Sequence, residues 1–343
     1  MALLFMDSFE HSTACGQGKW TTQRGGVPAG ISSTTGRFGN GWSQAGGRYI
    51  IRALGANYAT LICGFAFNPA GIGGNTIVAL LDGISRTDGQ VELTYNTGTQ
   101  TWTVTRRGTS IHSFFYPIAF GAFSYVEFKA TINNTTGIVV VRVNGVEIIN
   151  ITGQDTQFTA NAFANNLLLG STADTAEDYR YDDVYLLDTS GSAPTNDFLG
   201  DCRCESVLPS GNGNTSNLVG SDANSTDNYL LVDETTSTLG DGDTTYVESS
   251  TPGDKDTYAY GDLASTSGTV YGVQIIPVVK KTDAGARSIK TIARLSGTEV
   301  DGPERSLASG YTYLQDIRET KPGGGAWSIA DVNNAEFGLK VFA

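Results

Sequence analysis

Through its first 190 residues the chain alternates apolar and polar residues in short stretches, with turn-forming residues roughly every 8–14 positions. Side chains of a strand point alternately to the two faces of a sheet, so a two-residue period predicts strands with one buried face. This period is found in the stretches 91–95, 101–105, 125–132 and 181–187. No window in this half shows the 3.6-residue period of an amphipathic helix. We therefore expect a β-sandwich or barrel.

Asn144-Gly145 is the strongest turn signal in the chain. It separates the apolar stretches 138–143 and 146–151. Both central residues of a type I′ turn need positive φ, which asparagine and glycine adopt most readily. The dipeptide therefore predicts a two-residue β-hairpin.

Composition supports an all-β chain throughout. Among 343 residues there are 43 Gly, 41 Thr, 15 Tyr, 15 Phe and only 2 Met. Threonine and aromatic residues fit a pleated sheet, whereas glycine forms its turns. Charged residues make up 17%, too few for a solvated disordered chain. At about 150 residues per domain, this length predicts two domains.

The domain boundary is expected in a small, polar stretch that starts at Asp188 and ends at Pro194. We predict a first domain over 1–190, a connector over 191–206 and a smaller β-sandwich over 207–343. Within the last of these, residues 210–227 are nearly all Gly, Asn, Ser and Thr and suggest a long exposed loop. Strands are expected over 270–280, 287–294, 311–317 and 336–342. Ser328 and Asp331 have the spacing of a capping box, which predicts one helical turn.

The net charge is −13, from 35 acidic and 22 basic residues. No basic face is available to neutralise phosphates, so direct binding of nucleic acid or of an anionic membrane is not expected. No apolar run is long enough to cross a bilayer, and the first residues lack a signal peptide's basic region. Four cysteines without a CxxC pair predict reduced thiols rather than a zinc site. We expect a cytoplasmic protein, or one assembled there before release.

Two groups of motifs resemble known proteins. The first comprises Leu3–Phe9, Arg37-Phe38-Gly39, the Asn144-Gly145 hairpin and Tyr181–Tyr185, with its Asp-Asp pair. It resembles a concanavalin A-like (laminin-G-type) jelly roll, and this resemblance implies that the first and last strands pair. The second comprises Asn196–Arg203, Tyr229–Glu234, Trp327 and Glu336–Val341. It is similar to virion structural proteins of tailed bacteriophages, in which a second β domain follows a lectin-like one.

The second resemblance implies a non-enzymatic structural component of a tailed-phage virion. The expected role is peripheral adhesion or decoration, on the tail tip, baseplate, fibre or head. The expected partners are other virion proteins, further copies in a trimer or hexamer, and host surface glycans, and the expected location is the virion. A free-standing carbohydrate-binding or glycan-hydrolysing protein is the alternative.

The acidic stretch from Glu177 to Asp183 is the candidate for glycoside hydrolysis. A retaining enzyme needs two carboxyl groups about 5–5.5 Å apart. At ~3.3 Å per residue, Glu177 and Asp183 lie ~20 Å apart, and Asp178 and Asp182 ~13 Å apart. The stretch therefore predicts no catalytic pair. His11 and His112 lie in no recognisable catalytic motif, so we expect both to be structural.

Two further kinds of site have candidate residues. Asp241, Asp243, Asp254 and Asp256 supply the oxygen ligands that calcium prefers, without the ligand order of an EF-hand. No other cofactor is expected. Carbohydrate binding requires exposed aromatic rings, for which the candidates are Trp42, Tyr49 and Trp102, although rings of a sandwich core would explain the same residues.

Overall fold

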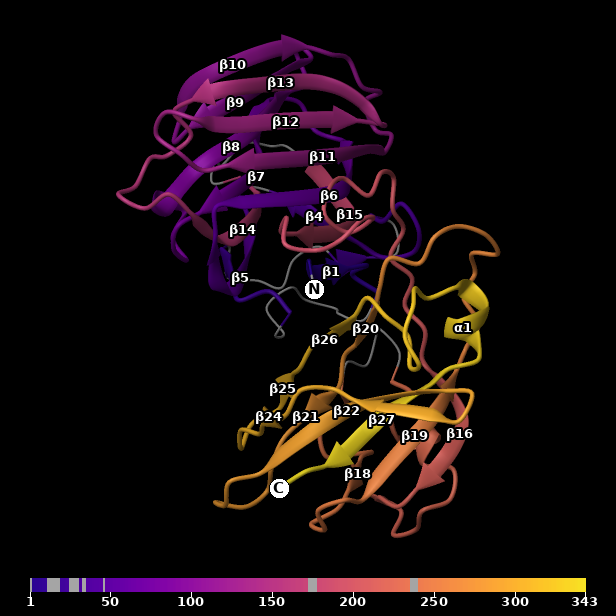
Figure 1. Cartoon of the computed structure of the whole chain (residues 1–343). Coiled ribbons are helices and arrows are strands. Elements are labelled where there is room, and N and C mark those ends of the chain that lie inside the picture. Colours follow the sequence, from indigo (N-terminus) through magenta and orange to yellow (C-terminus); the bar gives the residue numbers. More distant parts are fainter. Residues whose placement is uncertain are drawn as a thin grey trace. The chain divides into compact units, whose positions relative to one another are not determined.

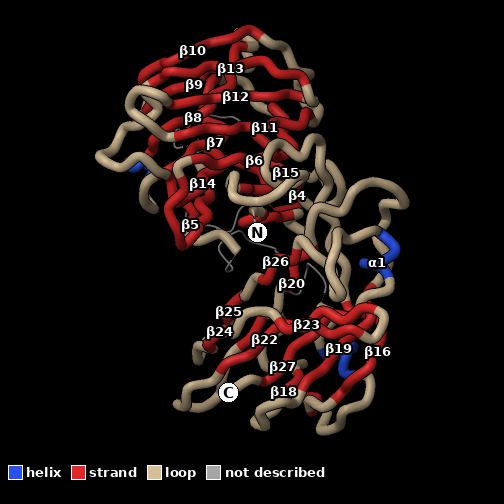
Figure 2. Tube along the Cα trace, viewed as in Figure 1, coloured by secondary structure: helices blue, strands red, loops and turns tan. Residues whose placement is uncertain are grey.

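The computed structural model describes residues 2–10, 19–24, 31–32, 35–45, 47–171, 178–234 and 240–343. Its chain divides into two compact units, Met1–Cys204 (unit 1) and Glu205–Ala343 (unit 2). Strands dominate both units, and helix is confined to short turns (Figure 2). The predicted all-β fold class is confirmed.

Unit 1 is a sandwich of two antiparallel sheets (Figure 1). The eight-stranded sheet has the order β13-β12-β11-β6-β15-β4-β3, and β1 pairs with β15. Its strands are β1 (Leu3–Asp7), β3 (Ile31–Ser32), β4 (Gly41–Ala45), β6 (Thr60–Pro69), β11 (Ser124–Thr131), β12 (Gly137–Val143), β13 (Val146–Gln154) and β15 (Asp178–Leu187). The pairing of β1 with β15 confirms that the first and last strands of the unit are neighbours.

The seven-stranded sheet has the order β10-β9-β8-β7-β14-β5-β2. Its strands are β2 (Thr22–Arg24), β5 (Tyr49–Tyr58), β7 (Gly74–Leu81), β8 (Gly89–Asn96), β9 (Thr101–Arg106), β10 (Thr109–Phe115) and β14 (Ala164–Gly170), and a short 3-10 helix, η1 (Arg86–Asp88), precedes β8. Inward-facing side chains of both sheets form one core, including Phe65, Phe67 and Phe128 from one sheet and Leu93 and Trp102 from the other.

The Asn144-Gly145 hairpin is confirmed. Asn144 has φ +50° and Gly145 φ +77°, as a type I′ turn requires. The turn joins β12 to β13, which are paired along their length. Asn144 also binds the neighbouring strand, because its Oδ1 accepts the Tyr125 N–H at 2.7 Å.

The last strand of unit 1 departs from strict alternation at Asp182 and Asp183. Its register against β6 shifts between Asp182 and Tyr185, and Asp183 has φ +51°. This β-bulge places both Tyr181 and Val184 in the core although they are three residues apart. Strict alternation would place Asp183 on the same face of the sheet as Tyr181. Because of the bulge, the two side chains do not share a face.

Unit 2 contains a six-stranded antiparallel sheet, in the order β16-β19-β27-β22-β23 with β24 paired to β22, and three two-stranded sheets. The elements are β16 (Pro209–Ser216), β17 (Val219–Gly220), η2 (Asn228–Leu231), β18 (Val247–Glu248), β19 (Lys255–Tyr260), β20 (Val273–Ile275), β21 (Val278–Val279), β22 (Ser288–Leu295), β23 (Thr298–Asp301), β24 (Arg305–Ser306), β25 (Thr312–Tyr313), β26 (Asp316–Arg318), α1 (Ile329–Asn333) and β27 (Glu336–Val341). Trp327 and Phe337 pack together in its core.

The capping box before α1 is confirmed. Ser328 Oγ accepts the Asp331 N–H, and Asp331 Oδ2 accepts the Ser328 N–H. Other expectations for this unit need correction. Pro277 interrupts the strand expected over 270–280, because proline lacks the N–H that a ladder requires. Residues 210–227 are not one exposed loop, since β16 pairs with β19 despite its glycine-rich sequence.

The structure also places the end of the first unit later than residue 190. Residues of the expected connector, 191–206, hydrogen-bond to unit 1 as far as Cys204. Long-range side-chain contacts hold this segment, so its small and polar composition did not reveal its attachment. Among the described residues, no helix is long and apolar enough to cross a membrane.

Candidate functional site

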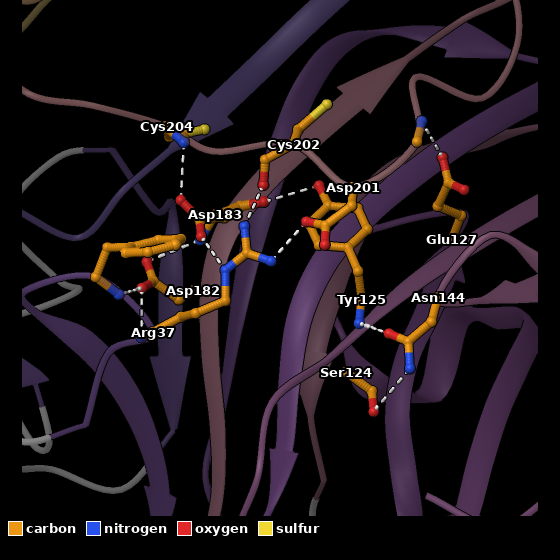
Figure 3. Close-up of polar contacts among 12 residues, drawn as sticks. Arg37, Ser124, Tyr125, Glu127, Asn144, Asp182, Asp183, Asp201, Cys202 and Cys204 are labelled. Carbon is orange, nitrogen blue, oxygen red and sulfur yellow. Dashed lines mark hydrogen bonds and ion pairs between the residues drawn. The ribbon is translucent and has the colours of Figure 1, made fainter. Parts of the chain in front are cut away.

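Motif residues from three distant parts of the chain meet in unit 1 (Figure 3). The Arg37 cluster, as we call it, consists of Arg37, Asp182, Asp183, Asp201, Cys202 and Cys204. Arg37 precedes β4, the two aspartates form the bulge of β15, and the last three residues follow in the segment that ends unit 1. One part of each group of motifs therefore lies in this cluster, Arg37 and the Asp182-Asp183 pair from the first group and Asp201 and Cys202 from the second.

The Arg37 guanidinium joins β15 to the segment that follows it. Its Nε donates to Asp183 Oδ2 at 2.9 Å, one terminal nitrogen donates to Asp201 Oδ1 at 2.5 Å, and the other to the Cys202 carbonyl at 2.6 Å. The planar group also lies 5.4 Å from the centre of the Tyr125 ring. Arginine suits this position because its rigid fork can donate to several acceptors at once.

Within the described ranges, the groups that donate hydrogen bonds to the Asp182 carboxylate are backbone N–H groups. Its Oδ2 accepts from Arg37 at 2.7 Å and Phe38 at 3.1 Å, and its Oδ1 accepts from Asp183 at 2.8 Å. Burial and the neighbouring Asp183 carboxylate nevertheless raise the pKa of Asp182 to about 7, against the lowering effect of these N–H groups. Asp182 is therefore a titratable group enclosed by protein.

Asp183 links the bulge to the end of the unit. Its Oδ1 accepts the Cys204 N–H at 2.7 Å, and its carbonyl accepts the Tyr125 hydroxyl at 3.1 Å. Burial raises the pKa of Asp183, although the Cys204 N–H and Arg37 act in the opposite direction. Both bulge aspartates are only 1% exposed. Arg37 forms the ion pair with Asp183, and the charge of Arg203 acts in the same direction.

The buried carboxylate of Glu127 holds the same segment at a point before Asp201. Glu127 on β11 accepts the Gly200 N–H at 2.8 Å and the Tyr185 hydroxyl at 2.5 Å. The Tyr185 oxygen in turn accepts the Leu199 N–H at 3.1 Å. Residues 199–204 are thus bound to the eight-stranded sheet through both Glu127 and the Arg37 cluster.

The chemistry of this cluster is that of a structural fastening. The carboxylates of Asp182 and Asp183, and that of the neighbouring Glu127, are enclosed and accept hydrogen bonds from the protein itself, whereas Asp201 binds Arg37 from the surface. Buried charges are stable in this way only when a counter-ion and donors surround them. The motifs predicted no site at this position, because no local pattern in the sequence links Arg37 to partners more than 140 residues away.

Two of the three sugar-binding candidates need correction. Trp42 and Trp102 are 2% and 0% exposed, so neither presents a ring face to a ligand. Trp42 packs against Tyr181, and Trp102 packs against Tyr95 while its indole N–H donates to the Tyr116 carbonyl. Tyr49 is half-buried beside a small apolar cluster on β5, β7 and β14. The structure does not bring the three rings together as a binding platform.

The four calcium candidates have other partners. Asp243 contacts Lys280 and the Tyr311 hydroxyl, which lower its pKa, and Asp241 accepts hydrogen bonds from Thr245. Asp254 accepts the Ser249 hydroxyl at 2.6 Å. In the part of the chain that the structure describes, no three His, Cys, Asp or Glu side chains are grouped to hold a metal.

Asp256 is the most informative of the four. It is fully buried, and its Oδ1 accepts the N–H groups of Asn217 and Leu218 at 2.7 and 2.8 Å. Its Oδ2 accepts from the Asn228 amide at 2.6 Å and from the Tyr258 hydroxyl at 2.9 Å. Four donors therefore occupy the oxygens that would have faced calcium. Asp256 fastens the chain after β16 onto β19.

The acidic residues from Glu177 to Asp183 do not form a pair of carboxylates that face each other. Glu177 lies outside the described residues. Asp178 binds Arg180 and Ser43, whereas Asp182 is buried in the Arg37 cluster. His112 is half-buried on β10, and His11 lies outside the described residues.

The thiols that the structure describes, Cys63, Cys202 and Cys204, form no disulfide, and Cys15 lies outside the described residues. Burial raises the pKa of Cys202 to about 12 and raises that of Cys204 well above its ordinary value. These thiols are poor nucleophiles as a result.

Comparison with known proteins gives no family. Neither the protein-family models nor the curated proteins contain a match. Among solved structures, an alginate lyase, Aly36B, is similar at 10% identity and a TM-score of 0.33, over 43% of this chain and 79% of that chain. A Trypanosoma rangeli sialidase is similar at 15% identity and a TM-score of 0.35, over 44% of this chain and 25% of its own. Likenesses this weak carry no argument.

Proposed function

We propose that this chain is a non-enzymatic structural component of a tailed-phage virion, with a peripheral adhesion or decoration role. It would sit on the tail tip, baseplate or fibre, or on the head, beside other virion proteins. Assembly would take place in the cytoplasm of the bacterial host. Host surface glycans are the external ligands that this role implies.

The observation that carries the proposal is that the motif residues of unit 1 form structural contacts inside the protein. Arg37, the Asp182-Asp183 bulge and residues 199–204 form a buried fastening of one segment to a sheet. Such a fastening serves a chain whose task is to hold a defined shape. A catalytic site would instead leave reactive carboxylates open to a substrate.

The candidate carboxylates for catalysis and for calcium binding support the same proposal. Asp182 and Asp256 are enclosed and accept hydrogen bonds from several donors each. Asp178 and Asp243 are paired with basic side chains. Each of these carboxylates is thus accounted for by packing or ion pairing within its own unit.

The proposal is tested on particles. Phage particles from a culture that encodes this chain are purified on a density gradient and analysed by quantitative mass spectrometry. We expect the chain in the particle fraction at a fixed copy number relative to the major capsid protein. Its recovery only in the particle-free fraction would contradict the proposal. Gold-labelled antibodies viewed by electron microscopy then distinguish head from tail.

The alternative, a free-standing protein acting on glycans, is tested on the purified chain. A glycan array measures binding, and release of reducing sugar from polysaccharides measures hydrolysis, with heat-unfolded chain as the control. Sugar release by the folded chain would overturn the non-enzymatic assignment. Binding without release, combined with recovery in particles, is the result expected of an adhesion protein.

A further inference from the structure

Lys19 and Asp7 form an ion pair inside unit 1. The Lys19 Nζ lies 2.9 Å from Asp7 Oδ1, and the two side chains are only 5% and 3% exposed. Their surroundings are aromatic, because Phe5 and Phe9 pack on the Trp20 ring and the Lys19 Nζ lies 5.7 Å from the centre of the Phe5 ring. Removing both charges from water is costly even when they are paired.

The other lysine–carboxylate pairs within the described ranges lie at the surface. Water reaches such pairs and stabilises the separate charges. In each of them both side chains are at least 20% exposed: Lys129–Asp197, Lys255–Glu299, Lys280–Asp243, Lys321–Asp331 and Lys340–Asp301. Lys19 and Asp7 differ from these pairs because protein, rather than water, surrounds both charges.

Lys19 has the properties of a buried nucleophile. Burial lowers the pKa of its ammonium group, and the charge of Arg52 acts in the same direction, against the Asp7 carboxylate. The Arg52 guanidinium is fixed nearby, since it donates to the Lys19 carbonyl at 2.6 Å and lies 4.9 Å from the centre of the Phe5 ring. Arginine keeps its proton, so lysine is the cation that can become neutral. A desolvated neutral amine is a good nucleophile.

The Asp7 carboxyl group is oriented for attack by this amine. Trp20 Nε1 donates to Asp7 Oδ2 at 2.7 Å, and the Phe9 N–H donates to Asp7 Oδ1 at 2.9 Å. Donors fixed on the two oxygens stabilise the negative charge that develops when a nucleophile adds to the carbon between them. The amine and the carboxyl group are already in contact, so no movement of the chain has to bring them together.

We propose that Lys19 and Asp7 condense to an amide, an isopeptide bond within unit 1. The amine attacks the carboxyl carbon of Asp7, so that a C–N bond forms and the bond from this carbon to Oδ1 breaks. Two of the three ammonium hydrogens leave with Oδ1 as water, and Oδ2 remains as the amide oxygen that accepts the Trp20 N–H. The step requires no oxidant, reductant or second substrate. It replaces two buried charges with one neutral polar group.

The bond joins the two sheets of the sandwich. Asp7 is the last residue of β1, in the eight-stranded sheet, and Lys19 precedes β2, in the seven-stranded sheet. A covalent link between residues distant in the sequence reduces the conformational freedom of the unfolded chain. Unit 1 is thereby stabilised where its two sheets begin. This inference does not depend on the virion role.

The test is a tryptic digest of the full-length chain, purified in its folded state and then unfolded and reduced. Trypsin cleaves after Lys19 and Arg24 in the unmodified sequence, but it does not cleave after a lysine whose amine is acylated. We expect one peptide that contains both Asp7 and Lys19, ends at Arg24 and is lighter than its sequence by one water. Its fragmentation in the mass spectrometer should release no fragment that ends within residues 8–18, because the ring holds both parts together.

The same digest contains a matched control. Lys129 Nζ lies 3.0 Å from Asp197 Oδ1, which is almost the separation found in the buried pair, but both side chains reach the solvent. We expect trypsin to cleave after Lys129 and the resulting peptides to have their full mass. Modification of Lys129 to the same extent as Lys19 would contradict the part assigned to burial.

Cleavage after Lys19 with full-mass peptides on both sides would overturn the proposal. Loss of water from a peptide that is still cleaved after Lys19 would also overturn it, since Asp7 can lose water alone by closing a succinimide with the Ser8 nitrogen. Lys19→Arg keeps a cation without a nucleophilic amine and is expected to abolish the loss of water, so a loss that persists would contradict the bond. Should this variant fail to fold, the wild-type digest decides by itself.

Discussion

Arg37 Nε lies 2.9 Å from Asp183 Oδ2, although 146 residues separate the two in the sequence. This ion pair closes unit 1, because the same guanidinium also binds the segment that ends the unit. A buried carboxylate that loses its cation remains desolvated without compensation. Loss of the Arg37 side chain is therefore expected to destabilise unit 1.

We expect Arg37→Met to lower the free energy of unfolding of unit 1 by about 3 kcal/mol, since it leaves the buried Asp183 without its counter-ion. Denaturant unfolding followed by tryptophan fluorescence measures this, because Trp20, Trp42 and Trp102 all lie in the core of unit 1. Arg287→Met is the control, as its pair with Asp283 lies on the surface and should not matter measurably. An equal effect of both changes would contradict the role of Arg37.

The pKa of Asp182 predicts an unusual pH dependence. A carboxyl group whose pKa is raised to about 7 in the folded state binds more protons there than when unfolded, between about pH 4 and 7. Its contribution to stability is therefore present at low pH and is lost as the pH rises through 7. We expect the unfolding free energy of the wild type, relative to Asp182→Asn, to fall between pH 5 and pH 8. A difference that rises or stays flat would contradict the raised pKa.

A substitution at Gly145 tests the predicted turn of the hairpin through its effect on backbone conformation alone. A Cβ at this position would meet nothing within 4 Å, but φ is +77°. Gly145→Ala should therefore destabilise unit 1 by about 1 kcal/mol, the cost of a left-handed conformation for an L-residue. The matched control is Gly98→Ala in the turn between β8 and β9, where φ is not left-handed and the nearest atom lies 3.4 Å away. Calorimetric melting of the two variants should separate them.

Asp256 and Asp254 are two residues apart and differ sharply in burial. Asp256→Asn would turn an amide N–H₂ towards groups that already donate, so we expect unit 2 to lose about 3 kcal/mol of unfolding free energy. Asp254→Asn keeps an oxygen for the single Ser249 hydroxyl and should cost less than 1 kcal/mol. Similar losses of unfolding free energy in both variants would show that the hydrogen bonds of Asp256 contribute no more to stability than that of Asp254.

Calcium should leave unit 2 unchanged. The oxygens of Asp256 already accept four hydrogen bonds, and Asp243 is paired with Lys280. A ligand that binds only the folded state would raise the melting temperature with concentration. We expect identical melting curves in excess Ca²⁺ and in chelator. A calcium-dependent rise would point to a site that these contacts do not explain.

Local patterns in the sequence determined the fold class and many of its elements. The Asn144-Gly145 turn, the Ser328–Asp331 capping box and the strands expected over 91–95, 101–105 and 125–132 depend mainly on neighbours in the chain, and these were confirmed. Such signals act through backbone conformation and the direction of each side chain. They can therefore be read without knowing what lies opposite.

Tertiary structure decided which side chains are buried and what they contact. Trp102 became a core residue and Asp256 a hydrogen-bonded hub because of strands that lie far away in the sequence. The bulge at Asp182-Asp183 interrupts an alternation that the sequence alone continued. Arg37 and Asp183 meet because β4 and β15 are neighbours in the eight-stranded sheet, and their attraction depends on burial and on a distance that no short-range pattern encodes.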